Sequence, residues 1–294
     1  MRIFLVAGHG YLNNVDTDLH KNYLTSYYTI RGDKPDHLEA WSEMIQKREF
    51  SILLDSGAFS AWKRDISISV DDYIEFVKKY EAAFWNYVTL DVKSTKSISV
   101  EESIRQTKEN TRIMEDAGLN PVPVYHGVNR RIDVLEELLE KYDFIFIGGL
   151  AGENRAVALQ SIADIWEVNS KPQYRKRLHA LGYTSTFNLL SYPWYSADST
   201  AWLSAMQFHD LQLKYTLSKG RQLAKDNLIR KMWFYPFKSL INEDLASKYL
   251  LPASMFDKED KKGWKSRIEA MVNVYHYLEN IITRMWEERG VIWE

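Results

Sequence analysis

The chain has 294 residues, of which 45% are apolar and 27% charged, so we expect one or at most two sizeable cores rather than disorder. It contains no cysteine, which excludes disulfide scaffolds, thiolate zinc sites, iron–sulfur clusters and cysteine nucleophiles. No stretch reads as a transmembrane helix, and the apolar run at residues 1–8 is too short for a signal peptide. We therefore expect a cytoplasmic protein without a membrane partner.

The net charge of −2 conceals an asymmetry along the chain. Residues 1–170 carry 19 basic and 27 acidic side chains, whereas residues 171–238 carry 11 basic and 3 acidic ones. A concentrated basic segment is typical of a phosphate-binding surface, and a solvated charged face is the equally weighted alternative. The predicted phosphate contacts are Lys171, Arg175, Lys176, Arg177, Lys214, Lys219, Arg221, Arg230 and Lys231.

Short apolar runs alternate with amphipathic stretches of helical length. In chain order, strands are expected at 2–7, 51–54, 87–90, 121–125, 144–147 and 177–181, and helices at 35–49, 70–84, 100–117, 131–142 and 154–169. Ser99 and Glu102 predict a capping box for the third helix, and Gly118 predicts its left-handed C-terminal residue. Residues 8–34 are interpreted as a lid or clamp, or equally as an ordinary ordered extension.

These strand–helix alternations predict an α/β fold with parallel strands buried on both faces. A single-domain (β/α)8 TIM-like barrel is the leading interpretation, and a doubly wound open sheet is the second. The count of eight strands is itself an inference, because after Asp198 the sequence becomes mostly helical. An apolar stripe predicts a long helix over about 264–289, which packs on the barrel or, as the alternative, forms a dimer seam: Trp264, Ile268, Met271, Tyr275, Leu278, Ile282 and Met285.

Polar residues and glycines follow the predicted strands, at the edge where parallel α/β folds place their active sites. They are His9, Asp55, Ser56, Gly57, Asp91, His126, Gly127, the run 148–152, and the run 196–199. Taken singly, each is more readily explained as a cap, a turn or a core histidine. Together they predict a site in which several carboxylates converge.

Paired carboxylates suit cleavage of a glycosidic bond, since one attacks the sugar carbon while the other moves protons on and off the leaving group. A third carboxylate accepts hydrogen bonds from the N–H edge of a purine, and backbone N–H groups of a glycine turn donate to its carbonyl. Hydrolysis by a metal ion ranks lower because no His-x-His or His-Glu-x-x-His pair is present. We expect neither a metal nor a cofactor.

At these residues the sequence resembles the tRNA-guanine transglycosylase superfamily, and more closely its phage and bacterial DpdA-like 7-deazaguanine DNA transglycosylases. The resemblance spans roughly residues 50–202. It rests on Leu-Asp-Ser-Gly-Ala-Phe at 54–59, Ile-Gly-Gly-Leu-Ala-Gly-Glu at 147–153, Asp91, and Asp-Ser-Thr-Ala-Trp at 198–202. It implies Asp198 as the nucleophile and Asp55 as the general acid/base.

The same resemblance implies that the base is bound by Ser56, Asp91, His126, Gly148, Gly149, Leu150 and Ala151. His126-Gly127 replaces the glutamine-glycine pair of the family. The tRNA-modifying members also carry a Cys3His zinc subdomain, which a chain without cysteine lacks. The implied activity is therefore exchange of guanine in DNA for a 7-deazaguanine such as the 7-cyano derivative, in a bacterial or phage-infected host cytoplasm.

Three alternatives stay open at this point: a tRNA-directed transglycosylase, a nucleoside or base hydrolase, and a non-catalytic nucleic-acid-binding barrel. The expected partners are DNA, or tRNA as the alternative, and the free 7-deazaguanine base. Aromatic residues of the basic segment, among them Trp194, Tyr195, Trp202, Trp233 and Tyr235, are candidates for stacking on bases or for filling the core.

Overall fold

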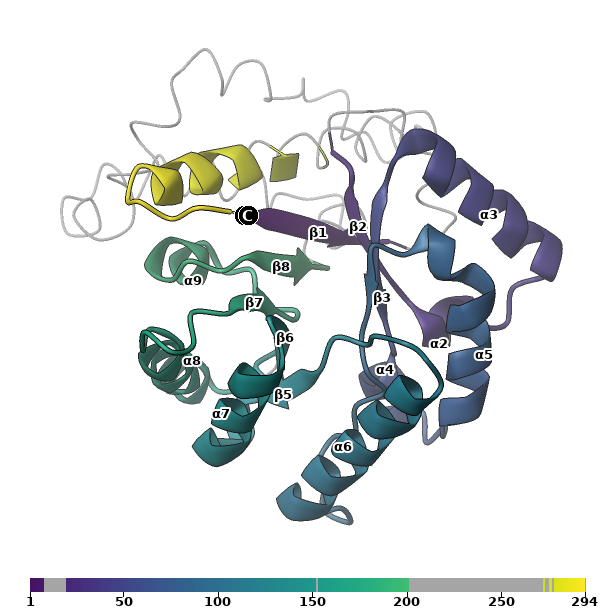
Figure 1. Ribbon diagram of the computed structural model, residues 1–294, viewed down its shortest axis with the longest axis horizontal. Helices are drawn as coiled ribbons and strands as arrows, with labels where there is room; N and C mark the ends of the chain where they lie inside the picture. The colour runs from purple at the N-terminus through teal and green to yellow at the C-terminus, as the bar shows by residue number, and fades with distance from the viewer. Residues whose placement is uncertain (8–19, 152, 201–271, 273–274, 277, 294) are drawn as a thin grey trace, which may run out of the picture.

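In the computed structural model, which describes residues 1–7, 20–151, 153–200, 272, 275–276 and 278–293, the chain is a mixed α/β protein (Figure 1). Its described strands form one eight-stranded, all-parallel sheet in the order β4-β3-β2-β1-β8-β7-β6-β5. The strands are β1 (Arg2–Val6), β2 (Asn22–Ser26), β3 (Ser51–Asp55), β4 (Asn86–Tyr87), β5 (Val124–His126), β6 (Phe144–Gly148), β7 (Arg177–Ala180) and β8 (Ser196–Ser199).

Helices follow most strands. They are α2 (Tyr27–Ile30), α3 (Pro35–Arg48), α4 (Ala58–Trp62), α5 (Val70–Tyr80), α6 (Val100–Asp116), α7 (Ile132–Lys141), α8 (Arg155–Asn169) and α9 (Thr186–Ser191), with 3-10 turns η1 (Glu81–Ala83) and η2 (Gly127–Asn129). The cap of α6 is confirmed in part: Ser99 Oγ accepts the Glu102 N–H at 3.1 Å, while the Glu102 carboxylate bonds Arg105 and Gln106. Gly118 has the expected left-handed backbone, with φ of +85°.

The sheet is curled but does not form the closed barrel that the sequence predicted, because its edge strands β4 and β5 form no ladder with each other and only one bridge lies between the residues beside them. Val88, directly after β4, pairs in parallel with Val122, just before β5. The Thr89 N–H donates to the Val122 carbonyl at 2.9 Å, and the Val122 N–H donates to the Tyr87 carbonyl at 2.8 Å. Because β4 and β5 share only this bridge, the fold is a TIM-like curled sheet without a full ladder at that position.

Two strands lie where the sequence did not predict them. β2 and α2 occupy residues 22–30, so this part of the expected lid or extension belongs to the fold, whereas residues 8–19 lie outside the described residues. The run 196–199, expected to follow the last strand, is itself β8. Both strands are short and rich in polar residues, so neither contains the apolar run by which the other strands are recognised.

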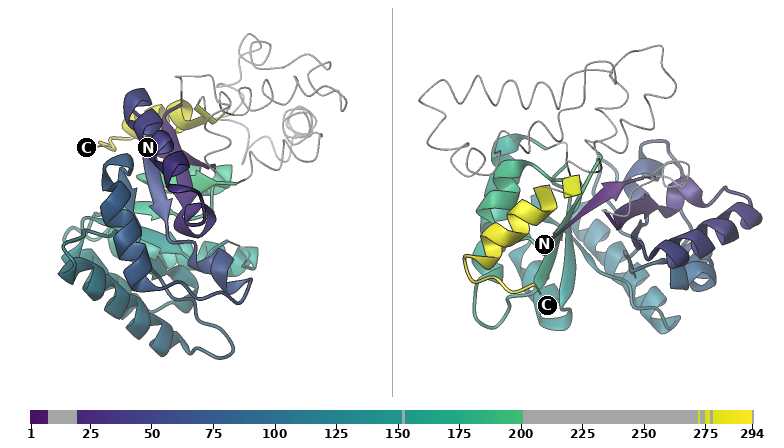
Figure 2. Two further views of the ribbon diagram at one scale, coloured as in Figure 1. Left: turned by 90° about the vertical axis from the view of Figure 1, so that its right-hand side faces the viewer. Right: turned by 90° about the horizontal axis from the view of Figure 1, so that it is seen from above.

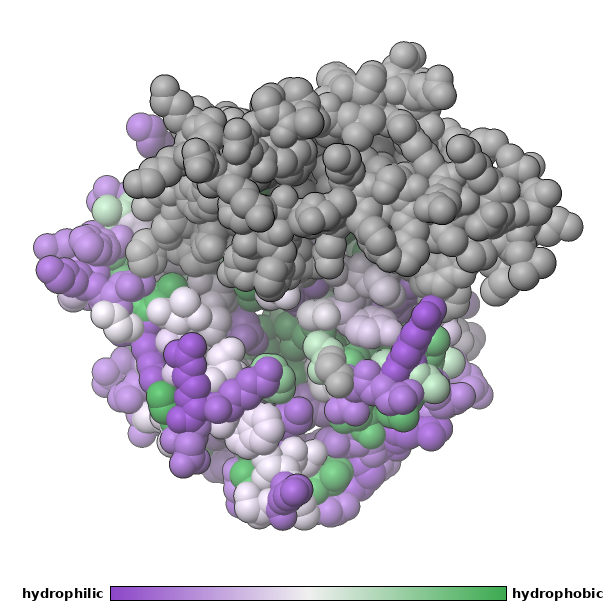
Figure 3. Space-filling model, turned by 180° about the vertical axis from the view of Figure 1, so that it is seen from behind, coloured by the Kyte–Doolittle hydropathy of each residue, from purple (hydrophilic) through white to green (hydrophobic). Residues whose placement is uncertain are grey.

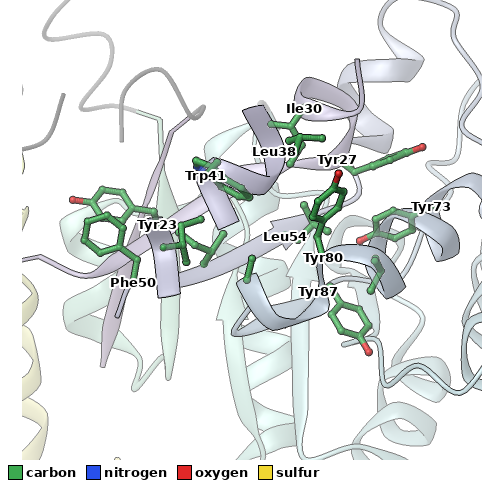
Figure 4. Close-up of a cluster of buried hydrophobic side chains, with 14 of the residues drawn as sticks. Tyr23, Tyr27, Ile30, Leu38, Trp41, Phe50, Leu54, Tyr73, Tyr80 and Tyr87 are labelled. Carbon is green, nitrogen blue, oxygen red and sulfur yellow. The ribbon is translucent and has the colours of Figure 1, made fainter. Parts of the chain in front are cut away.

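Side chains alternate between the inside and the outside of the curl, as the period of two in a β-strand requires. Phe4, Leu53, Val124 and Phe146 are among the residues packed together inside. Outside the sheet, one apolar cluster lies between β1–β4 and the helices α2, α3, α5 and α6, and part of it is drawn in Figure 4. A second outer cluster lies between β5–β8 and α7, α8 and α9.

Residues 272, 275–276 and 278–287 are the described part of the C-terminal helix, which lies beside the start of β1 and α9 (Figures 1 and 2). Ile282 is fully buried in the second outer cluster, and the Trp286 Nε1–H donates to the Leu189 carbonyl at 2.9 Å. The predicted packing of this helix is thus confirmed for its described part. Trp264, Ile268 and Met271 of the predicted stripe lie outside the described residues.

The face of the molecule shown in Figure 3 is mostly hydrophilic where its residues are described, with apolar side chains scattered among them. Among the described helices, none combines the length and the apolar character that crossing a lipid bilayer would require.

The packing of the C-terminal helix predicts a large loss of stability when Ile282 is shortened. Ile282→Ala is expected to lower the free energy of unfolding by about 2–5 kcal/mol, because it leaves a cavity against the sheet. Ile292→Ala is the matched control, since Ile292 is 77% exposed and its loss is expected to change stability by less than about 0.5 kcal/mol. Urea unfolding followed by circular dichroism measures both, and equal effects would contradict the packing.

Candidate active site

The residues expected to carry chemistry lie at the carboxyl edge of the sheet. Asp55, His126 and Gly148 are the last residues of β3, β5 and β6, and Asp198 is the third of the four residues of β8. Their neighbours Leu54, Tyr125, Ile147 and Ala197 pack in the outer clusters. Strand alternation therefore directs all four positions into the curl.

Asp55 is held in a turn in which its Oδ2 accepts the Gly57 N–H at 3.0 Å. Burial, the largest cause, and the negative charges of Asp91 and Asp198 together raise the pKa of Asp55 from 3.8 to about 7, against the lowering effect of hydrogen bonds from the turn backbone. A carboxyl group with a pKa near 7 is populated in both protonation states at neutral pH. This is the property required of a group that gives and takes protons in one reaction cycle.

Asp91 is held from two sides. Its Oδ1 accepts a hydrogen bond from Ser56 Oγ at 3.0 Å, and its Oδ2 lies 2.8 Å from His126 Nε2. Ser56 is fully buried and its Oγ also accepts the Ala58 N–H at 3.2 Å, which ties the carboxylate to the start of α4. The predicted base-binding residues Ser56, Asp91 and His126 thus form one hydrogen-bonded set beside Asp55.

Asp198 is only 5% exposed and is fixed through one of its two oxygens. Oδ1 accepts the Gly182 N–H at 2.6 Å and lies 3.2 Å from His179 Nε2. His179 stacks on Phe146 with ring centroids 4.2 Å apart, and burial lowers its pKa. A neutral His179 donates from Nε2 to Asp198, because its Nδ1 is engaged by Ser196 Oγ at 2.8 Å.

Two glycines of the site, Gly57 and Gly148, lie close to neighbouring side chains. Gly57 has φ of +75°, and a Cβ there would lie 2.2 Å from Ser26 Oγ and 2.4 Å from Tyr28 Cβ. A Cβ on Gly148 would lie 3.2 Å from the His126 ring. The glycines of both motifs are therefore required by close approach of neighbouring residues and, at Gly57, also by the backbone conformation.

The remaining residues of the 148–152 turn differ in placement. Gly149 has φ of +73°, Leu150 is fully buried in the second outer cluster, and Ala151 is exposed. The Leu150 side chain points away from the interior of the curl, so only its backbone is available to a ligand there. His9 and Gly152 lie outside the described residues.

The first group of predicted phosphate contacts lies at the opposite end of the strands from the carboxylates. Residues 171–177 connect α8 to the beginning of β7. Lys171 pairs with Glu136 at 2.9 Å, and Lys176 pairs with Asp143 at 2.6 Å. Phosphate binding by this group therefore does not place nucleic acid at the carboxyl edge. The second group lies outside the described residues: Lys214, Lys219, Arg221, Arg230 and Lys231.

Exposed aromatic rings flanked by cations lie on α4, directly after Asp55-Ser56-Gly57, and the sequence argument used Phe59 only as part of the 54–59 motif and gave it no role of its own. Phe59 is 43% exposed and Trp62 is 47% exposed, with ring centroids 6.1 Å apart. Lys93 Nζ lies 4.9 Å from the Phe59 ring and 5.2 Å from the Trp62 ring, and Lys63 Nζ lies 4.1 Å from Phe59. We call Phe59, Trp62, Lys63 and Lys93 the α4 platform.

His179 and Ser196 are two further residues that the sequence argument assigned no role. Their signal was available, because polar residues at alternate positions of β7 and β8 face the inside of a parallel curl. A pocket also opens between α6 and α7 over β5, bordered by Thr107, Tyr125 and Leu138. It includes His126 but none of the three carboxylates.

Comparison with known proteins assigns no family to this arrangement: no protein-family model matches the sequence, and no curated protein matches it.

The chemistry open to the site follows from its charges. Asp198 offers one oxygen that none of the described groups binds, Asp55 exchanges protons near neutral pH, and Asp91 presents a fixed hydrogen-bond acceptor. An attacking carboxylate, a proton shuttle and an acceptor are the parts needed for covalent transfer at an electron-poor carbon that carries a nitrogen or oxygen leaving group.

The raised pKa of Asp55 predicts a change in how stability depends on pH. The folded protein binds the proton up to pH 7, whereas the unfolded chain releases it near pH 3.8, so wild-type stability falls as pH rises through this window. Asp55→Asn cannot titrate and is expected to be more stable than wild type at pH 8, by a few kcal/mol, and to lose the decline.

Urea unfolding at pH 4.5 and pH 8 measures this difference. Glu43→Gln is the control, because Glu43 is exposed on α3 and its replacement leaves the wild-type slope in place. A decline in Asp55→Asn equal to that of wild type would show that the pKa of Asp55 is not raised.

Proposed function

We propose that this protein is a base-exchanging transglycosylase that replaces guanine in DNA with a 7-deazaguanine through a covalent aspartyl-glycosyl intermediate. The proposal rests on two carboxyl groups, Asp55 and Asp198, that lie at one edge of the curl and differ in how the protein holds them. Asp198 is buried and fixed through one oxygen, while the pKa of Asp55 is raised to about 7. These states match a nucleophile and a general acid/base.

In the first half-reaction the Asp198 oxygen that is not bonded to Gly182 attacks the anomeric carbon of the sugar. A C–O bond forms, the glycosidic C–N bond breaks, and its electron pair leaves with guanine. Protonated Asp55 gives its proton to the departing base. The Gly182 N–H and His179 Nε2 hold the other Asp198 oxygen, so the attacking oxygen keeps its direction.

In the second half-reaction the 7-deazaguanine occupies the same place. Asp55, now ionised, takes the proton from the ring nitrogen of the incoming 7-deazaguanine. That nitrogen attacks the anomeric carbon while the C–O bond to Asp198 breaks. Both carboxyl groups return to their starting states, so no cofactor enters the balance. Asp91, positioned by Ser56 and His126, accepts hydrogen bonds from the N–H edge of either base.

The α4 platform favours a nucleic acid over a free nucleoside as the substrate. A base extruded from a helix costs a few kcal/mol, which contacts to the flanking strand must offset. Rings of the size of Phe59 and Trp62 stack on bases without sequence preference, and the ammonium groups of Lys63 and Lys93 suit the phosphates between them. We place DNA first on the resemblance and on the lack of cysteine, with tRNA second.

The proposed nucleophile predicts that Asp198→Ala abolishes exchange. Purified protein is incubated with duplex DNA, single-stranded DNA or tRNA and labelled 7-cyano-7-deazaguanine, and label retained in the polymer is measured. We expect incorporation into DNA by wild type and a loss of about 1,000-fold or more in Asp198→Ala, because no covalent intermediate forms. Without the incoming base, only wild type forms a DNA adduct stable to denaturing electrophoresis.

Asp71→Asn is the control, since Asp71 is an exposed carboxylate in the first turn of α5 and has no part in the proposed site. Label in tRNA alone would redirect the proposal to a tRNA-directed enzyme, and free guanine without incorporation would indicate a hydrolase. Equal activity of wild type and Asp198→Ala would refute the assigned mechanism.

The α4 platform predicts a defect in binding that is separate from chemistry. Replacing Phe59 and Trp62 together by alanine is expected to weaken binding of a fluorescent single-stranded oligonucleotide by 10-fold or more, because base–aromatic stacking contributes about 1–3 kcal/mol per base. Single-turnover exchange at saturating DNA is expected to change by less than threefold. Ile66→Ala controls for loss of an exposed apolar side chain beside α4, and an equal loss in that variant would exclude stacking.

A further inference from the structure

A second cluster of chemically capable side chains lies at the amino edge of the sheet. His20 lies two residues before β2, and His276 and Glu279 lie one turn apart on the C-terminal helix. Glu279 Oε2 accepts the Ile3 N–H at 2.5 Å and the Asn22 Nδ2–H at 3.0 Å, so this helix is bonded to the beginnings of β1 and β2. The C-terminal helix lies over the N-terminal end of β1 in both views of Figure 2.

Each of the three side chains bonds the protein through one polar atom and has a second polar atom that could bind a ligand. His20 Nε2–H donates to the Asn22 carbonyl at 2.9 Å, whereas His276 Nε2 accepts from Asn280 Nδ2–H at 3.0 Å, so binding a metal through His276 Nδ1 requires the Asn280 amide to turn over and present its oxygen to Nε2–H. Both contacts leave Nδ1 as the remaining nitrogen, and Glu279 keeps Oε1. Metal-binding imidazoles and carboxylates are oriented in this way, with the second polar atom bonded to the protein.

An unpartnered buried nitrogen of His20 is an independent observation that points to a ligand. The side chain is fully buried, yet its Nδ1 has no hydrogen-bond partner among the described residues. A buried imidazole nitrogen without a partner is costly, and a lone pair directed at a cation removes that cost. The hydrogen bonds of Glu279 explain why a carboxylate lies here, but they leave His20 Nδ1 unexplained.

We propose that His20, His276 and Glu279 bind a divalent transition-metal ion that fastens the C-terminal helix to the amino edge of the sheet. One ligand atom from each of the three lies within 4.8 Å of the others. Donors around tetrahedral zinc are about 3.4 Å apart, given bonds of about 2.0–2.2 Å, so the half-exposed His276 needs only a modest side-chain movement. Two imidazoles with one carboxylate suit Zn²⁺ best, and Fe²⁺ and Mn²⁺ less well.

The position indicates that the ion is structural. The site lies at the end of the strands opposite to Asp55 and Asp198, where conserved chemistry in barrel-like folds supports stability rather than catalysis. It joins two segments more than 250 residues apart in sequence, His20 and the pair on the C-terminal helix. Metal binding to the folded state alone raises stability in proportion to the logarithm of free metal over the dissociation constant.

The test uses full-length protein treated with a chelator and then titrated with ZnCl2. We expect isothermal titration calorimetry to show one site of micromolar affinity or tighter, and the thermal midpoint to rise by several degrees with saturating zinc. His276→Ala and Glu279→Gln are expected to weaken zinc binding at least tenfold. His37→Ala serves as the matched control, because His37 is an exposed imidazole on α3.

Circular dichroism without zinc establishes that each variant is folded, and His276→Ala carries the comparison because this imidazole is not buried in the core. Zinc affinity unchanged in both ligand variants would overturn the site, since binding would then come from other histidines. Absence of zinc-dependent stabilisation in wild type would overturn it equally. Neither readout depends on base exchange, so the metal site and the proposed function succeed or fail separately.

Discussion

Electrostatic repulsion among three carboxylates is the constraint on which the candidate site depends. Asp55, Asp91 and Asp198 project toward one another inside a curl of apolar strands, and the interior does not hold three negative charges at low cost. The structure resolves this differently for each group. Asp91 is bonded by Ser56 and His126, Asp198 by Gly182 and His179, and Asp55 is left to bind a proton.

This division follows from strand geometry more than from any single motif. In a parallel curl, every second side chain faces inward, and the last inward position of each strand lies at one shared edge. Phe4, Leu53 and Phe146 fill the interior below that edge and exclude water from it. The apolar filling that stabilises the fold is therefore also what raises the pKa of Asp55, so packing and acid–base chemistry are linked.

Much of this arrangement was predictable from the sequence, and the reasons for the rest are physical. The apolar runs at 2–7, 51–54 and 144–147 predicted β1, β3 and β6, because strands buried on both faces are continuously apolar. β2 and β8 were missed since polar inward residues interrupt their apolar pattern. Asp55, Asp91 and His126 followed from their places after strands, and His179 could have been found from the alternation along β7. The α4 platform and the His20 cluster depend on long-range contacts without a local signature.

The two ends of the strands also carry different kinds of polar cluster, which argues for a division of labour along the curl. At the amino edge, Glu279 bonds β1 and β2, and Lys171 and Lys176 form ion pairs with Glu136 and Asp143. At the carboxyl edge, one oxygen of Asp198 and the exposed rings of the α4 platform remain available to a ligand. The proposed nucleic-acid substrate would therefore approach from the carboxyl edge, and among the described basic residues Lys63 and Lys93 are better placed for it than Lys171 and Lys176.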